Sequence, residues 1–243
     1  MSKYDELLHK IIEDVSSNSK FNKSTHCIFD LDSTLFNVTS RTEKILSELI
    51  DDKYFINNFP SEIKKLRKPL VNHDDWGIKE ALIRSGIECP KFYEKAKKYW
   101  AKRFFSNEYL KFDIPYAGAS EFVNELYSLG AHITYLTGRD QIRMLVGTVE
   151  SLKQWNFPVD LKHTSLALKP KSSDEDTEFK TNYINKLINQ YESLYFFENE
   201  PIIIHQVERL IPKIKIIFMD SVHSGRADPL DHWPKINMRF SRN

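Results

Sequence analysis

The sequence predicts an α/β protein: a doubly wound parallel sheet, with a block of helices inserted after its first strand. Three observations support this prediction. Short apolar runs rich in β-branched and aromatic residues stop at polar residues, as buried strands do. From residue 115 onward helical patterns separate these runs, an alternation typical of parallel sheets. Between residues 37 and 114, by contrast, helical patterns follow one another without a clear strand.

The first elements are an amphipathic helix and a short strand. Apolar residues recur at helical spacing across residues 4–16, and a serine-rich polar cluster follows them. Residues 25–29 then form an apolar run that stops at Asp30. The length and composition of this run favour a buried strand over a helix.

The predicted helical insert occupies residues 37–114 and contains an aromatic stripe. The stripe lies within residues 92–105 and consists of Phe92, Ala96, Tyr99, Trp100 and Phe104. Apolar side chains at this spacing are typical of a helix face packed on a core. The alternative is an aromatic wall that faces a substrate.

After residue 115 strands and helices alternate again. Gly130 closes one helix, Asp140 caps the next, and Pro201 suits the first turn of the last helix. The other predicted elements, in order, are helix 120–129, strand 131–136, helix 140–152, helix 177–191, strand 194–197 and strand 214–219. The parallel sheet is therefore built from residues 1–36 and 115–243.

Composition excludes several classes of protein. The 243 residues are 41% hydrophobic and 28% charged, and the formal net charge of +1 gives no reason to expect a nucleic-acid partner. The two cysteines make neither a disulfide framework nor a zinc site. The sequence has no apolar leader pattern and no membrane-length apolar stretch. We therefore expect a cytoplasmic protein without a membrane partner.

Polar residues follow three of the predicted strands. Asp30 and Asp32 follow the first strand; the next strand ends at Thr137, Gly138 and Arg139; the strand at 194–197 is followed by Glu198, Asn199 and Glu200. Ligands of doubly wound sheets bind outside the carboxyl ends of the strands. We therefore expect these side chains to converge on one crevice.

The pair Asp30 and Asp32 matches the needs of phosphoryl transfer. Alone, an Asp-x-Asp sequence is as typical of a turn or a helix cap, but this one directly follows an apolar strand. A carboxylate can attack phosphorus and form an aspartyl phosphate. A divalent cation offsets the repulsion between the two anions. A second carboxyl group can protonate the leaving oxygen and then activate water.

These motifs resemble those of the haloacid dehalogenase superfamily of phosphohydrolases. The first motif is Phe29-Asp30-Leu31-Asp32-Ser33-Thr34-Leu35, and the second is Leu136-Thr137-Gly138-Arg139-Asp140. The segment Phe196-Phe197-Glu198-Asn199-Glu200-Pro201 is similar to the fourth motif, and a lysine before the preceding helix would be the third. The resemblance implies a core domain of residues 1–36 and 115–243 and an inserted helical cap domain of residues 37–114.

The resemblance also implies roles for individual residues. Asp30 is the expected nucleophile and Asp32 the general acid and base, while Thr137 and a lysine contact the transferring phosphoryl group. The expected cofactor is Mg²⁺, bound by Asp30, by the backbone carbonyl of Asp32, and by Glu198 and Asn199. The superfamily usually has aspartates in the fourth motif, whereas this chain offers Glu198, Asn199 and Glu200.

Several assignments stay open at this point. The third-motif lysine is Lys169 or Lys180, and we prefer Lys180 because it lies near the start of the helix before strand 194–197. Gly138, Arg139 and Arg41 are candidates for substrate binding. For Arg41 a place on the insert surface is the alternative, and for Arg139 an ion pair with a carboxylate.

The sequence thus predicts a Mg²⁺-dependent phosphomonoester hydrolase acting on a small phosphorylated metabolite. A phosphotransferase or phosphomutase of the same superfamily is one alternative, and a non-catalytic binding protein with this fold is another. In this architecture the insert is expected to select the leaving group. Its aromatic and basic residues include Trp76, Tyr93, Lys97, Trp100 and Arg103, and they permit sugars, nucleotides or other esters alike. The pattern leaves the physiological substrate and the oligomeric state open.

Overall fold

A computed structural model describes residues 3–66 and 71–241 of the chain. Its main sheet has six strands in the order β5-β4-β1-β6-β7-β8, and all neighbouring strands are parallel. The strands are β1 (Thr25–Phe29), β4 (His132–Asp140), β5 (Thr164–Lys169), β6 (Ser193–Glu198), β7 (Lys215–Met219) and β8 (Lys235–Ile236). This sheet confirms the predicted α/β fold class.

The strand order creates a switch point beside β1. From β1 the chain proceeds to β4 and β5 on one side, and from β6 it proceeds to β7 and β8 on the other. Connections that leave two adjacent strands in opposite directions open a crevice at the carboxyl ends of those strands. In this fold the crevice lies between the ends of β1 and β6.

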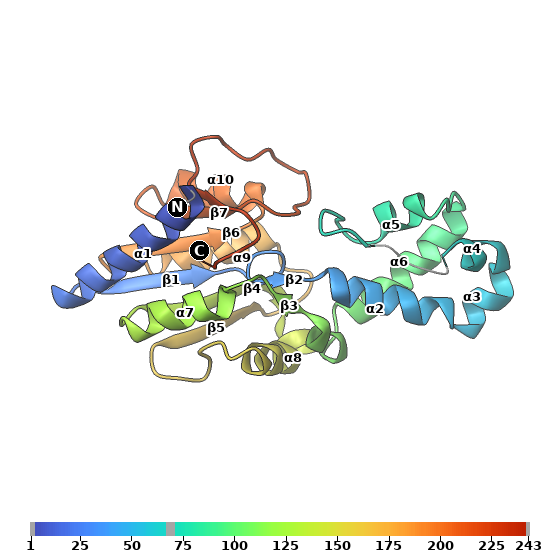
Figure 1. The fold of residues 1–243 in the computed structure, drawn as a ribbon, viewed down its shortest axis with the longest axis horizontal. Coiled ribbons are helices and arrows are strands. Elements are labelled where there is room, and N and C mark those ends of the chain that lie inside the picture. Colours follow the sequence, from blue (N-terminus) through green and yellow to red (C-terminus); the bar gives the residue numbers. More distant parts are fainter. Residues whose placement is uncertain (1–2, 67–70, 242–243) are drawn as a thin grey trace.

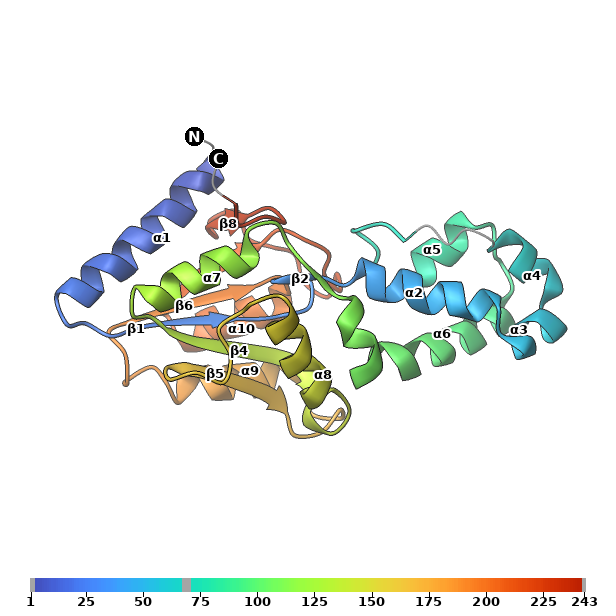
Figure 2. The same cartoon turned by 60° about the horizontal axis from the view of Figure 1, so that its bottom comes forward.

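Helices cover both faces of the sheet (Figures 1 and 2). One face carries α1 (Lys3–Lys20), α7 (Ala119–Ser128) and α8 (Gln141–Gln154), and the other carries α9 (Asp176–Asn185) and α10 (Pro201–Leu210). Because side chains alternate along a strand, Cys27 and Phe29 join the first hydrophobic cluster and Ile28 joins the second. Strand β1 is consequently buried on both faces, as its apolar sequence predicts.

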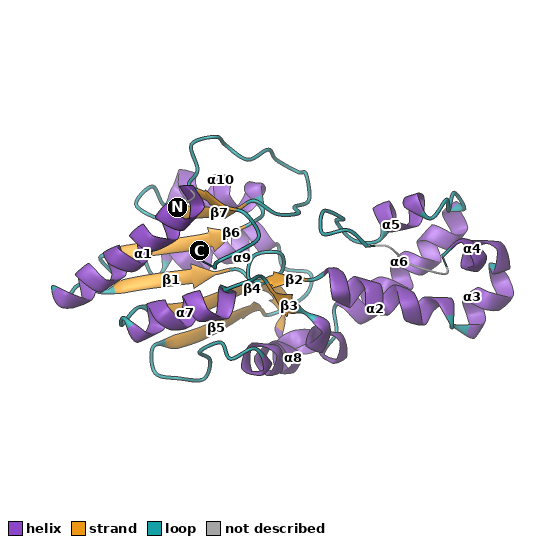
Figure 3. Ribbon diagram, in the orientation of Figure 1, coloured by secondary structure: helices purple, strands orange, loops and turns teal. Residues whose placement is uncertain are grey.

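The helical insert, residues 38–113, extends away from the carboxyl ends of the strands (Figures 1 and 3). Its elements are α2 (Thr39–Ile50), α3 (Lys53–Asn58), α4 (Pro60–Lys65), α5 (Lys79–Arg84), α6 (Pro90–Phe104) and the 3-10 helix η1 (Asn107–Phe112). It has a hydrophobic core of its own, in which Phe92 and Ala96 are fully buried. At these two positions the core-packing interpretation of the aromatic stripe is confirmed.

A two-stranded antiparallel sheet closes the base of the insert. Strand β2 (Phe36–Asn37) pairs with β3 (Ile114–Pro115), so the chain enters and leaves the insert at one place. The start of α2 and the end of η1 are thereby held close together: the Ser40 hydroxyl donates to the backbone oxygen of Phe112 at 2.7 Å. Residues 72 positions apart can therefore share one polar network.

Local signals account for several boundaries. The Asp140 carboxylate accepts a hydrogen bond from the Arg143 backbone N–H at 3.0 Å, which confirms the predicted cap of α8. Pro201 occupies the first turn of α10, also as predicted. Gly130, with a φ of +93°, follows α7 and permits the turn into β4.

Other boundaries differ from the prediction. Helix α1 continues to Lys20, through the serine-rich cluster that was expected to end it. Helix α9 ends at Asn185 rather than near residue 191, because turns follow it. Edge strand β5 was not predicted, since its sequence Thr-Ser-Leu-Ala-Leu-Lys is only partly apolar and half-buried. Within the described residues, no helix combines the length and apolar character needed to cross a membrane.

Candidate active site

Asp30 lies at the first position beyond β1, in the crevice between β1 and β6. Its backbone N–H donates to the Phe197 oxygen at 3.0 Å, which extends the sheet register by one residue past the strand. The next residues turn sharply, with Ser33 in the left-handed region at a φ of +62°. The backbone N–H groups of Leu35 and Phe36 both donate to the Leu31 oxygen at 2.9 Å. This turn holds Asp30 and Asp32 at the end of the sheet.

Lys180 of α9 lies between two carboxylates from neighbouring strand ends. Its Nζ donates to Asp30 Oδ1 at 2.6 Å and to Glu198 Oε2 at 2.7 Å. All three side chains are buried. We call Asp30, Lys180 and Glu198 the lysine cluster. Asp30 comes from the end of β1, Glu198 from the end of β6, and Lys180 from α9, which precedes β6 in the sequence.

The lysine cluster has two carboxylates for one ammonium. Burial raises the pKa of Glu198 to about 7, although the Lys180 charge acts in the opposite direction. Burial likewise raises the pKa of Asp30, against the same lysine. Burial disfavours charged Lys180, but Asp30 and Glu198 outweigh this effect and raise its pKa. Ionising both carboxylates beside a single ammonium group is therefore unfavourable in this buried place, and a further cation would favour their ionised forms.

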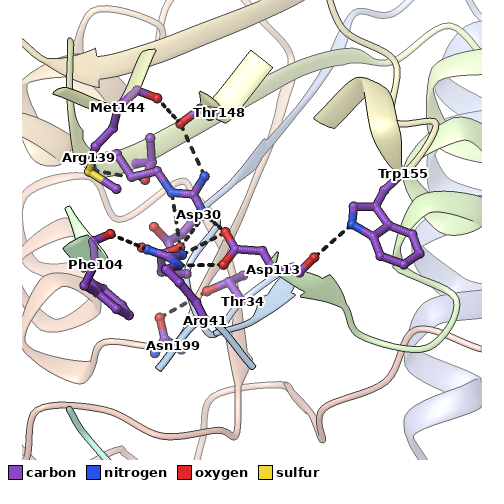
Figure 4. A network of polar contacts seen from close by, with 12 residues as sticks. Asp30, Thr34, Arg41, Phe104, Asp113, Arg139, Met144, Thr148, Trp155 and Asn199 are labelled. Atoms are coloured by element: carbon purple, nitrogen blue, oxygen red, sulfur yellow. Dashed lines mark hydrogen bonds and ion pairs between the residues drawn. The ribbon is translucent and has the colours of Figure 1, made fainter. Parts of the chain in front are cut away.

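Asp32 lies in a second ion cluster, whose other members, Arg41, Arg139 and Asp113, are labelled in Figure 4. Its Oδ1 accepts hydrogen bonds from Arg41 Nη2 at 2.8 Å and from Arg139 Nη2 and Nε at 2.5 and 3.1 Å. Both guanidinium groups also donate to Asp113, which is fully buried. We call Arg41, Arg139 and Asp113 the arginine clamp.

The arginine clamp keeps Asp32 ionised. Burial acts to raise the pKa of Asp32, but Arg139 and Arg41 outweigh burial and hold the pKa well below its usual range. Every hydrogen bond to the Asp32 side chain reaches Oδ1, and no residue in the ranges 3–66 and 71–241 donates to Oδ2. The side chain is 29% exposed and borders the cavity described below. One carboxylate oxygen is thus held while the other is available to a ligand.

The end of β4 contributes Thr137 and Gly138. The Thr137 Oγ1 accepts a hydrogen bond from the Arg139 backbone N–H at 3.2 Å, which leaves its own hydrogen available for a ligand oxygen. At Gly138 an added Cβ would lie 2.9 Å from Asp176 Oδ2. Because Lys169 Nζ holds the same carboxylate at 2.5 Å, a larger residue at position 138 would disturb an ordered pair.

The residues after β6 are fixed by the backbone and by neighbouring loops. Glu198 Oε1 accepts from the backbone N–H groups of Asn199 and Glu200 at 2.9 and 3.0 Å. The Asn199 amide donates to the Val222 oxygen at 2.6 Å, and its Oδ1 accepts from the Thr34 hydroxyl at 3.1 Å. Glu200 accepts from the backbone N–H of Ser224 at 3.0 Å instead of turning toward Asp30.

A cavity of about 690 Å³ connects these groups to the helical insert. Its sheet side is lined by Asp30, Asp32, Thr137, Gly138, Arg139, Lys180, Glu198 and Asn199, and its insert side by His73, Trp76, Lys79, Tyr93, Lys97 and Trp100. A volume of this size suits a small organic ligand. The ends of β1, β4 and β6 form one wall of the cavity and the insert forms the other.

Comparisons with solved structures identify the fold. A haloacid dehalogenase-like family hydrolase from Streptococcus pneumoniae aligns over 89% of this chain and 94% of its own, with a TM-score of 0.50 and 12% identity. Protein tyrosine kinase A from Mycobacterium tuberculosis aligns over 88% of this chain and 93% of its own, also with a TM-score of 0.50 and with 14% identity. This chain has the haloacid dehalogenase-like fold. No protein-family model and no curated protein matches it by sequence.

Within the haloacid dehalogenase-like fold, the oxygen donors around Asp30 fit a magnesium ion. Asp30 and Glu198 provide carboxylates, and Asn199 adds an amide oxygen. Mg²⁺ often uses only one or two protein carboxylates and completes its octahedron with water and substrate phosphate. The described residues contain no cluster of three or more His, Cys, Asp or Glu side chains suited to a metal. Two carboxylates and one amide do not make such a cluster, so a bound Mg²⁺ would take its remaining ligands from water and substrate.

The structure separates the two candidate lysines. Lys180 contacts Asp30 and Glu198, whereas Lys169 Nζ contacts Asp176 and the backbone oxygen of Asp174, at 2.5 and 2.9 Å. Lys180 is therefore the lysine that a phosphoryl group on Asp30 would meet.

The two arginines lie differently from the expected substrate contacts. Arg41 is fully buried, does not border the cavity, and is fully engaged with Asp32, Asp113 and the Phe104 oxygen. Its expected contact with substrate is corrected to a contact with Asp32, and it does not lie on the insert surface either. Arg139 borders the cavity but pairs with carboxylates, the alternative that the sequence left open.

Sequence reasoning missed Asp113, and it left open which residues of the insert face the crevice. Asp113 is a single aspartate between η1 and β3, and no motif or spacing in the sequence marks it. Of the aromatic and basic residues named in the insert, Trp76, Tyr93, Lys97 and Trp100 border the cavity, and for Trp100 this is the alternative to core packing. Arg103 does not, because it stacks on Tyr99 at 3.3 Å.

Proposed function

We propose that this protein is a Mg²⁺-dependent phosphomonoester hydrolase that forms an aspartyl phosphate on Asp30. The lysine cluster is the observation that carries this proposal. Asp30 borders a ligand-sized cavity, and Lys180 beside it can neutralise a transferring phosphoryl group. Two carboxylates, Asp30 and Glu198, beside one ammonium group favour a divalent cation at the same place. Bound Mg²⁺ supplies electrostatic stabilisation of the phosphoryl oxygens.

In the first step an Asp30 carboxylate oxygen attacks phosphorus, and the bond from phosphorus to the leaving oxygen breaks. Asp32 Oδ2 donates a proton to that oxygen. Asp32 rests as a carboxylate in the free protein, so the proton arrives with the substrate: the phosphate monoester binds as a monoanion and transfers its proton to Asp32 Oδ2, whose pKa is raised by the phosphate charge beside it. Thr137 donates a hydrogen bond to a phosphoryl oxygen, and Lys180 offsets the negative charge.

In the second step Asp32 acts as a base. Its carboxylate takes a proton from a water molecule, the water oxygen attacks phosphorus, and the bond between Asp30 and phosphorus breaks. Phosphate leaves and Asp30 is regenerated as a carboxylate. The low pKa that the arginine clamp gives Asp32 favours the carboxylate form to which it returns when phosphate leaves.

We further propose that the helical insert is a cap domain that selects the leaving group of a small phosphorylated metabolite. The leaving group extends from Asp30 toward Trp76, Tyr93 and Trp100, which offer flat apolar surfaces. Lys79 and Lys97 line the same wall and make no ion pair with any residue that the structure describes. Planar or anionic leaving groups suit this wall best.

A turnover assay tests the proposal. We expect the purified protein to release phosphate from members of a panel of phosphate monoesters with Mg²⁺ present, and to lose this activity with a chelator. Asp30→Asn should lower turnover by about 1000-fold or more. The variant should remain folded, because Lys180 and Glu198 then form a balanced pair.

Asp75→Asn is a matched control, since Asp75 also borders the cavity but pairs with Arg84, away from the strand ends. We expect it to retain activity within about threefold, as for a substitution outside the reacting centre. Absence of turnover by folded wild-type protein over the whole panel and several divalent metals would favour a non-catalytic binding protein. Near wild-type turnover by Asp30→Asn would remove Asp30 from the nucleophile role.

The fold alone does not choose between hydrolysis and transfer to another acceptor, as the kinase name of one structural neighbour illustrates. Assays with added acceptor alcohols separate the two. We expect free phosphate to remain the main product, because Asp32 can activate water. Predominant transfer to the acceptor would indicate a phosphotransferase or phosphomutase.

A further inference from the structure

Three separate parts of the chain meet at Asp32. Arg41 comes from α2 of the helical insert, Asp113 from the linker that leaves the insert, and Arg139 from the end of β4. In Figure 4 the Arg41 and Asp113 side chains face each other and are joined by two hydrogen bonds. Arg41 Nε donates to Asp113 Oδ1 at 2.6 Å and Arg41 Nη2 to Oδ2 at 2.8 Å.

The cluster is electrically balanced and closed to solvent on one side. Asp113 and Arg41 are completely buried, and Arg139 is nearly so. With Asp32 included, two guanidinium groups face two carboxylates. Buried charges of this kind are stable only when each is paired and hydrogen-bonded. Each member therefore fixes the positions of the others.

Asp113 holds both guanidinium groups that hold Asp32. Its Oδ2 accepts from Arg41 Nη2 and also from Arg139 Nη2, at 2.8 and 2.7 Å. Its own backbone is fixed from the other side, because the Trp155 indole N–H donates to the Asp113 oxygen at 2.9 Å. Asp113 does not border the cavity, so it can act on a ligand only through the two arginines.

The contacts to Asp32 have a direction. The three hydrogen bonds from the clamp to the Asp32 side chain all reach Oδ1, which leaves Oδ2 without a donor from the described chain, and Asp32 itself borders the cavity. A carboxylate held by one oxygen can rotate little, so its other oxygen keeps a fixed position. Fixed geometry of this kind is what a proton transfer to a leaving oxygen requires.

We propose that Asp113 is a positioning residue for Asp32: it orients Arg41 and Arg139 so that Oδ2 of Asp32 faces the leaving oxygen of the substrate. This proposal rests on the proposed function, in which Asp32 transfers the proton. Because Arg41 and Asp113 belong to the insert and its linker, the clamp also makes the placement of Asp32 depend on how the insert is seated on the sheet.

Two substrates with different leaving groups test the proposal. Phenyl phosphate releases a phenol with a pKa near 10, like that of tyrosine, and so needs a proton from Asp32. The leaving group of p-nitrophenyl phosphate is much more acidic and departs without that proton. The measurement is the rate of phenol release in a single turnover with Mg²⁺, which isolates the first step from phosphoenzyme hydrolysis.

Two variants remove the clamp. Asp113→Asn leaves two cations against one carboxylate and can unfold the protein, so it is paired with the double variant Arg41→Gln/Asp113→Asn, which keeps Arg139 and Asp32 balanced. In the folded double variant we expect phenol release to fall about 10- to 100-fold, at the low end of general acid contributions. Nitrophenol release should fall by less than about threefold, since it needs no acid.

Trp155→Phe is the matched control, because it removes a hydrogen bond to Asp113 at the backbone and leaves the carboxylate in place. It should slow both substrates equally or not at all. An equal loss for the two substrates in the double variant would mean that the Arg41–Asp113 pair is only structural and would overturn the inference. Failure of folded wild-type protein to release either phenol would instead overturn the proposed function, and the inference with it.

Discussion

The lysine cluster and the arginine clamp lie side by side at the end of β1 but differ in charge balance. Lys180 alone faces Asp30 and Glu198, whereas Arg41 and Arg139 face Asp32 and Asp113. The pKa of Asp30 is raised by burial, and that of Asp32 is lowered by its arginines in spite of burial. Two aspartates two residues apart thus experience opposite environments.

Because their charge balance differs, the two clusters allow one turn to hold two carboxylates, Asp30 and Asp32, for separate tasks. The unbalanced lysine cluster favours an added cation, which would offset the repulsion between its carboxylates and a transferring phosphoryl group. The arginine clamp already balances the charge of Asp32 and requires no added cation. It keeps the Asp32 carboxylate in a fixed orientation. Substitutions that change the balance of one cluster should leave the other largely unaffected when the two are independent.

The largest effect is expected from removing the only cation of the lysine cluster. Lys180→Gln leaves two buried carboxylates without a counter-charge, and we expect it to lower stability by about 3–5 kcal/mol in urea unfolding. We also expect kcat/KM to fall about 100- to 1000-fold, because the phosphoryl charge loses its neutralising group.

Lys169→Gln is the matched control for this variant. Lys169 is also largely buried, but its partner Asp176 is half-exposed and does not touch Asp30. We expect a stability loss of about 1 kcal/mol and little loss of activity. A larger loss of activity for Lys169→Gln than for Lys180→Gln would reverse the choice of the phosphate-binding lysine.

A smaller effect is expected from pH in the absence of metal. The folded pKa of Glu198 is about 7, above the ordinary value of 4.5. A carboxyl group whose pKa is raised by folding adds to the free energy of unfolding. This contribution is complete at pH values below the ordinary pKa and is lost as the pH rises through the pKa of the folded protein. The contribution of Glu198 to the free energy of unfolding should therefore decline between pH 4.5 and 7, by about 1.4 kcal/mol per pH unit at most.

The comparison with Glu198→Gln isolates this effect. Buried His26, whose pKa is lowered to about 3 by burial, changes stability in the opposite sense over the same pH range. The difference between wild type and variant cancels that background. We expect the difference in unfolding free energy with chelator present to shift in favour of the variant as pH rises to 7. If the difference in unfolding free energy between wild type and Glu198→Gln does not change with pH, burial does not raise the pKa of Glu198.

The sequence was sufficient to predict which polar residues lie together at the carboxyl ends of the strands. Asp30, Thr137 and Glu198 each follow a buried apolar strand, and parallel strands of one sheet bring their carboxyl ends together. The preference for Lys180 over Lys169 followed from its place on the helix before β6. These inferences needed only local pattern and the rules of parallel sheets.

The arginine clamp could not be inferred in the same way. Asp113 is 72 residues from Arg41 and 26 from Arg139, and the three meet only because β2 and β3 pair at the base of the insert. Sequence spacing carries no signal of such a meeting. The expected substrate contact of Arg41 failed for the same reason, since its burial depends on the packing of Phe104 and Asp113 around it.

Edge strand β5 illustrates a second limit. Its side chains are mostly half-buried, so the sequence lacks the continuous apolar run that marked β1 and β6. Its place is set by pairing with β4, a contact made by the backbone. Tertiary pairing of this kind overrides a weak local preference.

The most direct test of the central claim is to trap phosphate on Asp30. Protein mixed with p-nitrophenyl phosphate and Mg²⁺ is quenched in acid, and the modified peptide is located by mass spectrometry. We predict a hydroxylamine-sensitive phosphate on the peptide that contains Asp30, absent from Asp30→Asn and from samples with chelator. Turnover accompanied by phosphate on another residue, or retained in Asp30→Asn, would contradict the account.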